Sequence, residues 1–332
     1  MTTFNIYRRE VGDIDPPVAI ATGLTSKSYH DTTAEAGKQY LYSVRVVVSS
    51  VEKVSDEISV AASPLWTPQA LTLALWLDAK DTSTLTVALD NTVSEWRDKS
   101  GNNRHATQDT LSLKPFYSAS EFCLSSESSL KKMTGVFTGI TDGSINEYTL
   151  FIVAKPKKTS AYVSSQNNSG ASFYTYDSDN SIFFIAVSSS ESSPSGATST
   201  IFSATTNAIA LTETRSGLAP HLISRAHSIG SEKLMIGVLR TNSGVITSRI
   251  NGTNASGATA PVNNIGWDTY LIFGQYTASS VGYGEIHEIL LVHNGDLGAG
   301  VIDKIEGFLA HKWDLLSSLP SDHPYKTSPP LL

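Results

Sequence analysis

Short runs of β-branched and aromatic residues, bounded by glycine, asparagine, aspartate or serine, recur along most of this 332-residue chain. Such runs are typical of strands, and the polar clusters between them are typical of turns. Clear examples are residues 40–46, 148–154 and 233–239. Helical periodicity appears near the C-terminus, at residues 299–316. The sequence therefore predicts an all-β protein of sandwich or jelly-roll type with one C-terminal helix.

A joint that contains two prolines, at residues 62–68, divides the chain. Proline fixes φ and biases the residue before it to extended conformations, so we expect this joint to be stiff. The length of the chain is sufficient for more than one hydrophobic core. We therefore predict two domains, residues 1–63 and residues 64–332.

In the first domain, Tyr40, Tyr42, Val44 and Val46 alternate along one predicted strand and point to one face. With the short strands around it, this pattern resembles the second half of a fibronectin type III domain, an immunoglobulin-like β-sandwich, with Tyr40 in the place of the tyrosine corner. Complete domains of this kind have about 100 residues and seven strands, and the first two strands have no counterpart here. The resemblance implies a truncated sandwich with one bare apolar face. We favour a docking role, in which another protein covers that face; the alternative is that the second domain covers it.

Five segments of the second domain carry a resemblance to a known family: residues 76–85, 96–101, 284–293, 306–313 and 319–326. Their order, their lengths and their residue sequences resemble the concanavalin A-like lectin/glucanase (laminin-G-like) sandwiches. These sandwiches are frequent in bacteriophage tail and receptor-binding proteins and in bacterial surface proteins. The resemblance implies a jelly-roll sandwich that holds a glycan or a neighbouring protein and turns over no substrate.

Charge and cysteine content exclude several classes of function. The net charge is −7 and no cluster of Lys and Arg is longer than two adjacent residues, so we expect no nucleic-acid binding. Cys123 is the single cysteine and cannot form a disulfide within the chain. No segment approaches the ~20 apolar residues of a membrane span, and the start lacks the apolar stretch of a signal peptide. In a chain that resembles modules of phage and bacterial surface proteins, the lack of a signal peptide favours a protein that is assembled in a host cytoplasm and carried in a virion; a bacterial surface is the alternative.

Asp78, Asp81 and Asp98 lie beside Trp76 and Trp96 in segments that the family resemblance places close together. Oxygen ligands on neighbouring loops suit calcium, and some laminin-G-like relatives bind it, so these three residues are the candidate calcium ligands. The alternative, which we favour, is that Asp78 and Asp98 accept backbone N–H bonds in tight turns. We expect no other cofactor. The scattered histidines, without a pair at i, i+4 on a helix, favour no zinc site.

Carbohydrate recognition needs exposed aromatic rings and amide groups on loops. Six residues fit that description and are the candidate carbohydrate-binding residues: Gln166, Asn167, Asn168, Tyr174, Tyr176 and Tyr283. The alternative, which we favour for the tyrosines, is packing on strands.

Glu285 and Glu288 invite comparison with the catalytic carboxylates of glycanases. Retaining hydrolysis needs two carboxyl groups on one face, about 5–5.5 Å apart. Strict alternation places Glu285 and His287 on one face and Glu288 on the other, so no catalytic pair is predicted and the protein is not expected to be an enzyme. Glu288 is expected to make structural hydrogen bonds.

These expectations combine into one functional hypothesis. The chain is a multicopy bacteriophage virion protein, tail-associated or receptor-binding, whose N-terminal domain binds other virion proteins and whose lectin-like domain attaches to host surface glycan. Many copies then offset a weak single site. The alternative is a purely structural capsid or tail decoration protein that binds no sugar, and a glycoside hydrolase is the third hypothesis.

Overall fold

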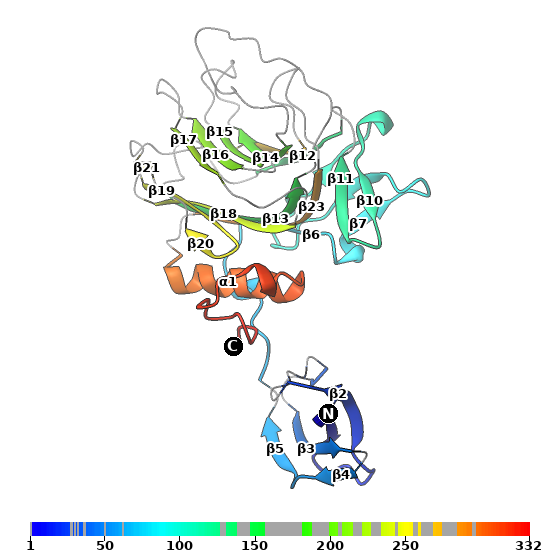
Figure 1. The fold of residues 1–332 in the computed structure, drawn as a ribbon. Helices are drawn as coiled ribbons and strands as arrows, with labels where there is room; N and C mark the ends of the chain where they lie inside the picture. The colour runs from blue at the N-terminus through cyan, green and yellow to red at the C-terminus, as the bar shows by residue number, and fades with distance from the viewer. Residues whose placement is uncertain are drawn as a thin grey trace. The chain divides into compact units, whose positions relative to one another are not determined.

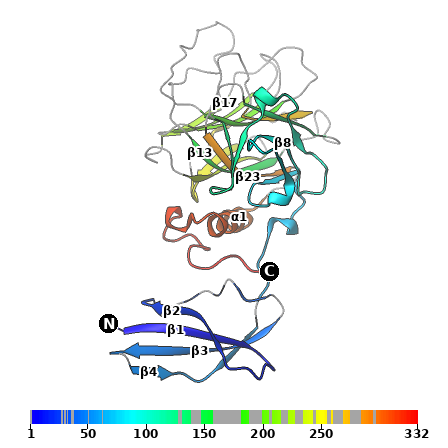
Figure 2. The same ribbon diagram turned by 90° about the vertical axis from the view of Figure 1, so that its right-hand side faces the viewer.

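The computed structural model describes residues 2–26, 29, 31, 33–35, 38–49, 51–61, 63–126, 131–137, 147–156, 181–187, 199–204, 208–214, 221–226, 234–242, 245–254, 258–259, 268–273, 284–293 and 297–332. It divides into two compact units. The small unit is Met1–Thr67 with Tyr325–Leu332, and the large unit is Pro68–Pro324. Figure 1 and Figure 2 show the strands of each unit and the helix of the large one.

The described strands of the small unit form one antiparallel sheet. The order is β2-β1-β3-β4, and β5 pairs with the first half of β3 while β4 pairs with its second half. Their bounds are β1 Thr2–Glu10, β2 Val18–Leu24, β3 Gln39–Val48, β4 Val51–Val54 and β5 Ile58–Ala61. The hydroxyl of buried Tyr40 accepts a hydrogen bond from the Glu35 amide (3.1 Å), the bond expected of a tyrosine corner. This sheet corresponds to one layer of the predicted sandwich, and the fibronectin likeness stays a prediction.

The C-terminal tail belongs to the small unit. Leu65 and Leu331 form an isolated antiparallel bridge. The Trp66 amide donates to the Pro330 carbonyl (3.0 Å), and the Leu332 amide donates to the Pro64 carbonyl (3.1 Å). The tail is therefore fixed by main-chain hydrogen bonds to the segment that follows β5.

The described strands of the large unit form two antiparallel sheets. The first, here called the β23 sheet, has the order β10-β11-β23-β13-β18-β19-β20, with β6 also on β23 and β21 on β19. Its strands are β6 Leu75–Asp78, β10 Phe116–Ser118, β11 Cys123–Ser126, β13 Tyr148–Pro156, β18 Met235–Asn242, β19 Val245–Ile250, β20 Thr253–Asn254, β21 Ala258–Thr259 and β23 Gly284–His293.

The second sheet, here called the β22 sheet, has the order β17-β16-β15-β14-β22-β12-β9-β8-β7. Its strands are β7 Leu85–Val87, β8 Val93–Trp96, β9 Ala106–Thr107, β12 Met133–Val136, β14 Ser181–Val187, β15 Ser199–Ala204, β16 Ala208–Thr214, β17 His221–Ala226 and β22 Thr269–Ile272. Both views show the two sheets stacked face to face (Figures 1 and 2). The predicted all-β sandwich fold is confirmed.

The hydrophobic core lies between these sheets. Leu150 and Ile152 of β13 belong to it, as do Trp96 of β8 and Tyr270 of β22, and all four are fully buried. Phe151, between the two core residues of β13, points to the outer face of the β23 sheet and is also fully buried. Because both faces of β13 are covered, the strand reads as a continuous apolar run.

Helix α1, Ala299–Lys312, lies across the outer face of the β23 sheet (Figure 1). It begins at the predicted residue and ends four residues before the predicted end, where Trp313 takes the C-cap position. Ile302, Ile305 and Leu309 are buried on its apolar side, as the helical periodicity predicts.

A β-bulge interrupts the alternation of β23. Val153 of β13 pairs with Glu288, but the next residue, Ala154, pairs with Ile286, so His287 is the extra residue. Ile286 and Ile289 both reach the core. His287 and Glu288 consequently share the outer face, and the prediction that strict alternation separates them is wrong at this point.

Candidate functional site

Glu288 is the centre of a buried polar network on the outer face of the β23 sheet. Its Oε1 accepts a hydrogen bond from Trp76 Nε1 (2.7 Å), and its Oε2 accepts one from Trp313 Nε1 (2.6 Å) and pairs with Lys312 Nζ (2.8 Å). Burial raises the pKa of Glu288, and the Lys312 ammonium opposes that shift. The predicted structural role of Glu288 is confirmed, because the carboxylate ties β6, β23 and α1 together.

The three candidate calcium ligands lie at the edge of this network, and their carboxylates already have cationic or N–H partners. Lys99 Nζ lies 2.8 Å from both Asp78 Oδ2 and Asp81 Oδ2, and Lys312 Nζ lies 2.7 Å from Asp78 Oδ1. Hydrogen bonds from Lys99 lower the pKa of Asp81.

Asp98 lies just after β8, and its carboxylate accepts hydrogen bonds from N–H and O–H groups. The amides of Trp76 and Ser100 donate to its Oδ1, each at 2.9 Å, and the Arg104 amide donates to its Oδ2 at 3.1 Å. The Asp78 carboxylate likewise accepts from the Lys80 amide (3.1 Å). Both aspartates thus make the turn contacts that we favoured from the sequence; calcium binding stays a prediction.

All six candidate carbohydrate-binding residues fall outside the described residues: Gln166, Asn167, Asn168, Tyr174, Tyr176 and Tyr283. Their role stays a prediction.

The bulge changes the argument about catalytic carboxylates. Glu285 and Glu288 share the outer face, so alternation no longer separates them. Each one is nevertheless engaged: Glu288 by two indoles and an ammonium, and Glu285 by Lys155, whose Nζ lies 3.2 Å from Oε2. Glu285 and Glu288 therefore do not form a catalytic pair in which one carboxylate is free to act as the nucleophile.

A second buried charge cluster links α1 to β19. The Arg249 guanidinium bridges two carboxylates of α1, with Nη1 at 2.8 Å from Asp303 Oδ1 and Nη2 at 2.9 Å from Glu306 Oε2. The Gly252 amide donates to Glu306 Oε1 (3.0 Å). His323 Nε2 lies 3.9 Å from Glu306 Oε2. The guanidinium therefore already supplies the positive charge at this cluster.

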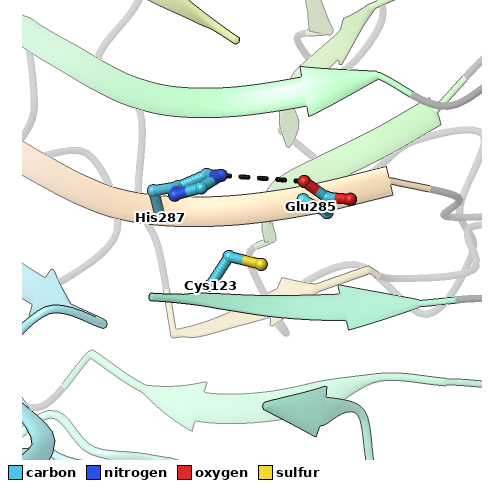
Figure 3. Close-up of side chains that lie close together, drawn as sticks. All are labelled: Cys123, Glu285 and His287. Atoms are coloured by element: carbon cyan, nitrogen blue, oxygen red, sulfur yellow. Dashed lines mark ion pairs between the residues drawn. The ribbon is translucent and has the colours of Figure 1, made fainter. Parts of the chain in front are cut away.

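A third cluster is assembled by Cys123 of β11 and by Glu285 and His287 of β23 (Figure 3). One ligand atom from each of the three side chains lies within 4.8 Å of the other two. The alternation of residues in the sequence predicts that Glu285 and His287 share one face of a strand. Cys123, over 160 residues earlier in the chain, has no signal that connects it to them.

The small unit carries a different feature, an exposed apolar surface. Side chains that share one face of its sheet by cross-strand pairing form this surface, here called the apolar face: Phe4, Ile6, Val18, Val44, Val46, Val48, Val51, Ile58 and Val60. On the opposite face, Arg9 pairs with Glu57 (2.6 Å) and Arg45 with Glu52 (3.2 Å). The first face is apolar except at one end, where Arg8 and Tyr42 share it and Arg8 pairs with Asp31 (2.6 Å). The second face is polar and carries the two other ion pairs.

Among the described residues, no helix has the length and apolar character that crossing a membrane requires.

Comparisons with known proteins give only distant likenesses. No protein-family model and no curated protein matches the chain. It is similar to the receptor-binding domain of botulinum neurotoxin D, with a TM-score of 0.49 and 10% identity over 71% of this chain and 52% of that one. The binding domain of botulinum neurotoxin DC, in complex with rat synaptotagmin II, gives 0.46 and 14% identity over 72% and 52%. The receptor-binding domain of botulinum neurotoxin type G gives 0.46 and 15% over 74% and 51%. The chain spans about half the length of these structures, and at such TM-scores the likeness carries no argument about function.

Proposed function

We propose that the chain is a non-enzymatic attachment protein of a bacteriophage virion. Its small unit docks on another virion protein, and its large unit presents a lectin-like sandwich to a glycan on the host surface. The observation that carries the proposal is the apolar face of the small unit, of which the described residues among 31–35 cover only the end around Arg8, Tyr40 and Tyr42.

The exposure of this face is large for a five-stranded sheet. Val18, Val51 and Ile58 each keep more than 60% of their surface accessible. Soluble proteins normally cover or break up contiguous apolar surface, because exposing it to water costs about 25 cal/mol per Å². Exposed apolar side chains over most of one face and ion pairs on the other suit an element that completes its sandwich with a partner chain.

The large unit supports a binding role through its architecture. Its described strands form a two-sheet sandwich whose described buried charges are used internally, as Glu288 with Lys312 and Glu306 with Arg249 show. Such a frame is rigid and leaves recognition to the loops at the ends of the sheets. The predicted carbohydrate-binding residues lie in such loops by sequence, and several copies on one particle would give avidity to a weak site.

A matched pair of substitutions tests the docking step. Ile58→Glu places a charge on the apolar face, whereas Ser59→Glu places the same charge on the neighbouring residue, which points to the polar face. We expect Ile58→Glu to abolish incorporation of the full chain into particles and Ser59→Glu to leave it unchanged. Equal incorporation of both variants would refute docking through this face.

Electron microscopy of purified particles labelled with an antibody to the large unit separates the two virion roles. Label at the distal tail, together with binding of the full chain to host lipopolysaccharide or capsule, supports receptor attachment. Label spread over the capsid or tail tube, without glycan binding, supports the alternative of a decoration protein. Particles without label would overturn both.

A further inference from the structure

The group of Cys123, Glu285 and His287 combines three kinds of metal-ligating atom at one point of the β23 sheet. The antiparallel register pairs Leu124 of β11 with Ile286 of β23, so Cys123 and His287 are the next neighbours across the ladder. Glu285 is two residues from His287 and shares its face. Figure 3 shows the thiol, the imidazole and the carboxylate gathered over these two strands.

His287 is the least satisfied group of the three. Its side chain is only 3% exposed, and neither ring nitrogen has a partner within strict hydrogen-bond geometry. Burial lowers the pKa of the ring, and the Glu121 main chain, which acts on the ring as an acceptor, opposes that shift. The edge-to-face contact with Trp313, at 5.0 Å between ring centroids, fills one side of the ring without supplying a polar partner. Glu285 Oε2 lies 3.9 Å from His287 Nε2, beyond hydrogen-bond distance. A buried imidazole with at least one nitrogen left unpaired normally has an explanation, and a bound ion is one.

We propose that Cys123 Sγ, His287 and the Glu285 carboxylate form a binding site for one Zn²⁺-class transition-metal ion. The donor set of sulfur, nitrogen and oxygen suits zinc, and it excludes calcium and magnesium, which require oxygen ligands. Three protein ligands leave a fourth position for water or for an external ligand.

The separations are close to those of a coordinated set. Zinc bonds of about 2.0–2.3 Å in a tetrahedron place ligand atoms roughly 3.3–3.8 Å apart. The three atoms here all lie within 4.8 Å of one another, so they approach by about 1.5 Å at most when the ion binds. Side-chain rotation is sufficient, because the two strands are already hydrogen-bonded to each other.

Lys155 is the group that competes with the ion. It pairs with Glu285 across the ladder between β13 and β23, and its Nζ lies 3.2 Å from Glu285 Oε2. Its side chain is 32% exposed and that of Glu285 is 18% exposed, which marks the side from which an ion enters. When the metal binds, the ammonium moves out to solvent and the carboxylate turns to the ion.

A nucleophilic role for the same residues is excluded by the state of the thiol. A catalytic cysteine is an accessible thiolate with a lowered pKa. Cys123 is 1% exposed, and burial, together with Glu285 and Glu121, raises its pKa to about 12.

Cobalt provides the direct test, because a thiolate ligand gives Co²⁺ a charge-transfer band. The full chain, reduced and freed of metal by a chelator, is titrated with Co²⁺ and then with Zn²⁺. We expect one equivalent of Co²⁺ to bind with a thiolate band and tetrahedral d–d absorption, and Zn²⁺ to displace it. Failure of the wild-type chain to develop a thiolate band would overturn the proposal.

Four variants sharpen the test. Cys123→Ser is expected to abolish the band, and Glu285→Gln and His287→Gln to weaken zinc binding at least about tenfold. Lys155→Met removes the competitor and is expected to strengthen binding several-fold, a gain that misfolding does not produce. His323→Gln alters the other cluster of acidic and histidine residues and is the control that keeps wild-type affinity. Unchanged affinity in both His287→Gln and Lys155→Met, or loss in His323→Gln alone, would refute the assignment.

Discussion

The small unit and the large unit are both built from antiparallel strands with alternating side chains, but the described structure covers the apolar face of a sheet with a second sheet only in the large unit. Leu150 and Ile152 of β13 are fully buried there, whereas Ile58 of β5 in the small unit keeps 66% of its surface exposed. Alternation therefore predicts which face of a strand is apolar, and it does not predict what covers that face.

The two units also treat charge differently. In the large unit Glu288 is fully buried and is held by two indole N–H groups and Lys312. In the small unit the ion pairs of Arg9 with Glu57 and of Arg45 with Glu52 are partly exposed to solvent. Equal substitutions should consequently have unequal effects in the two units, and the following predictions measure that inequality.

The largest effect is expected from Glu288→Ala. It leaves the Lys312 ammonium and two indole N–H groups buried with fewer acceptors, and removal of one partner of a buried ion pair costs about 3–5 kcal/mol. Urea unfolding followed by tryptophan fluorescence measures this loss, since four of the five tryptophans lie in the sequence of the large unit. Glu95→Ala is the control, because Glu95 pairs with Arg97 at the surface and its loss should cost about 1 kcal/mol or less. Equal losses would show that the network around Glu288 does not stabilise the fold.

Matched isoleucines compare the two apolar faces directly. Ile152→Ala empties part of the core and should lower the free energy of unfolding by about 2–5 kcal/mol. Ile58→Ala in the small unit removes an exposed side chain and should change it by about 0.5 kcal/mol or less. NMR of the isolated full chain during urea titration resolves both units. A large loss for Ile58→Ala would mean that another part of the chain covers the apolar face, which would contradict docking on a partner.

Sequence patterns predicted much of this fold for a physical reason. The runs at residues 148–154 and 233–239 are apolar and β-branched, and β13 covers the first of them and β18 the second from Met235 on; both strands have buried residues on each face. The helix was predicted at residues 299–316, and α1 lies within that range, because its apolar positions recur with helical spacing. Both patterns are set by residues that are near one another in the chain, so they can be recognised from the sequence alone.

The site depended on features that are not local. The β-bulge at His287 arises from the pairing of β23 with β13, and no pattern in residues 284–293 predicts the extra residue. Cys123 reaches His287 only through the register of β11 on β23. A sequence-based search for metal ligands at fixed spacing therefore passes over this group, whose members come from two distant strands.

Gly135→Ala tests how closely the large unit is packed. Gly135 of β12 pairs with Tyr270 of β22, and the Tyr270 ring lies over the glycine, so an added Cβ would overlap the ring. Tyr270 is fully buried and its hydroxyl donates to the Arg104 carbonyl (2.6 Å), which restricts its movement. We expect a loss of about 1–3 kcal/mol in urea unfolding. Gly300→Ala, in the first turn of α1 with open space around it, should instead be neutral or slightly stabilising. Two neutral results would show that Tyr270 moves freely, contrary to a rigid core.

The smallest effect is expected from pH in the small unit. Asp31 receives hydrogen bonds from Thr33, Tyr42 and Arg8; burial opposes them, but together they lower its pKa below the usual 3.8. A carboxyl with a lowered pKa in the folded state contributes stability above its unfolded pKa, and that contribution is lost as the pH falls through the folded value. The small unit should therefore lose about 1 kcal/mol between about pH 6 and about pH 3. NMR of β1 and β3 amides during urea titration at both pH values measures the loss. In Asp31→Asn the remaining dependence on pH should be smaller by that amount; an unchanged dependence would show that Asp31 and Arg8 do not stabilise the sheet.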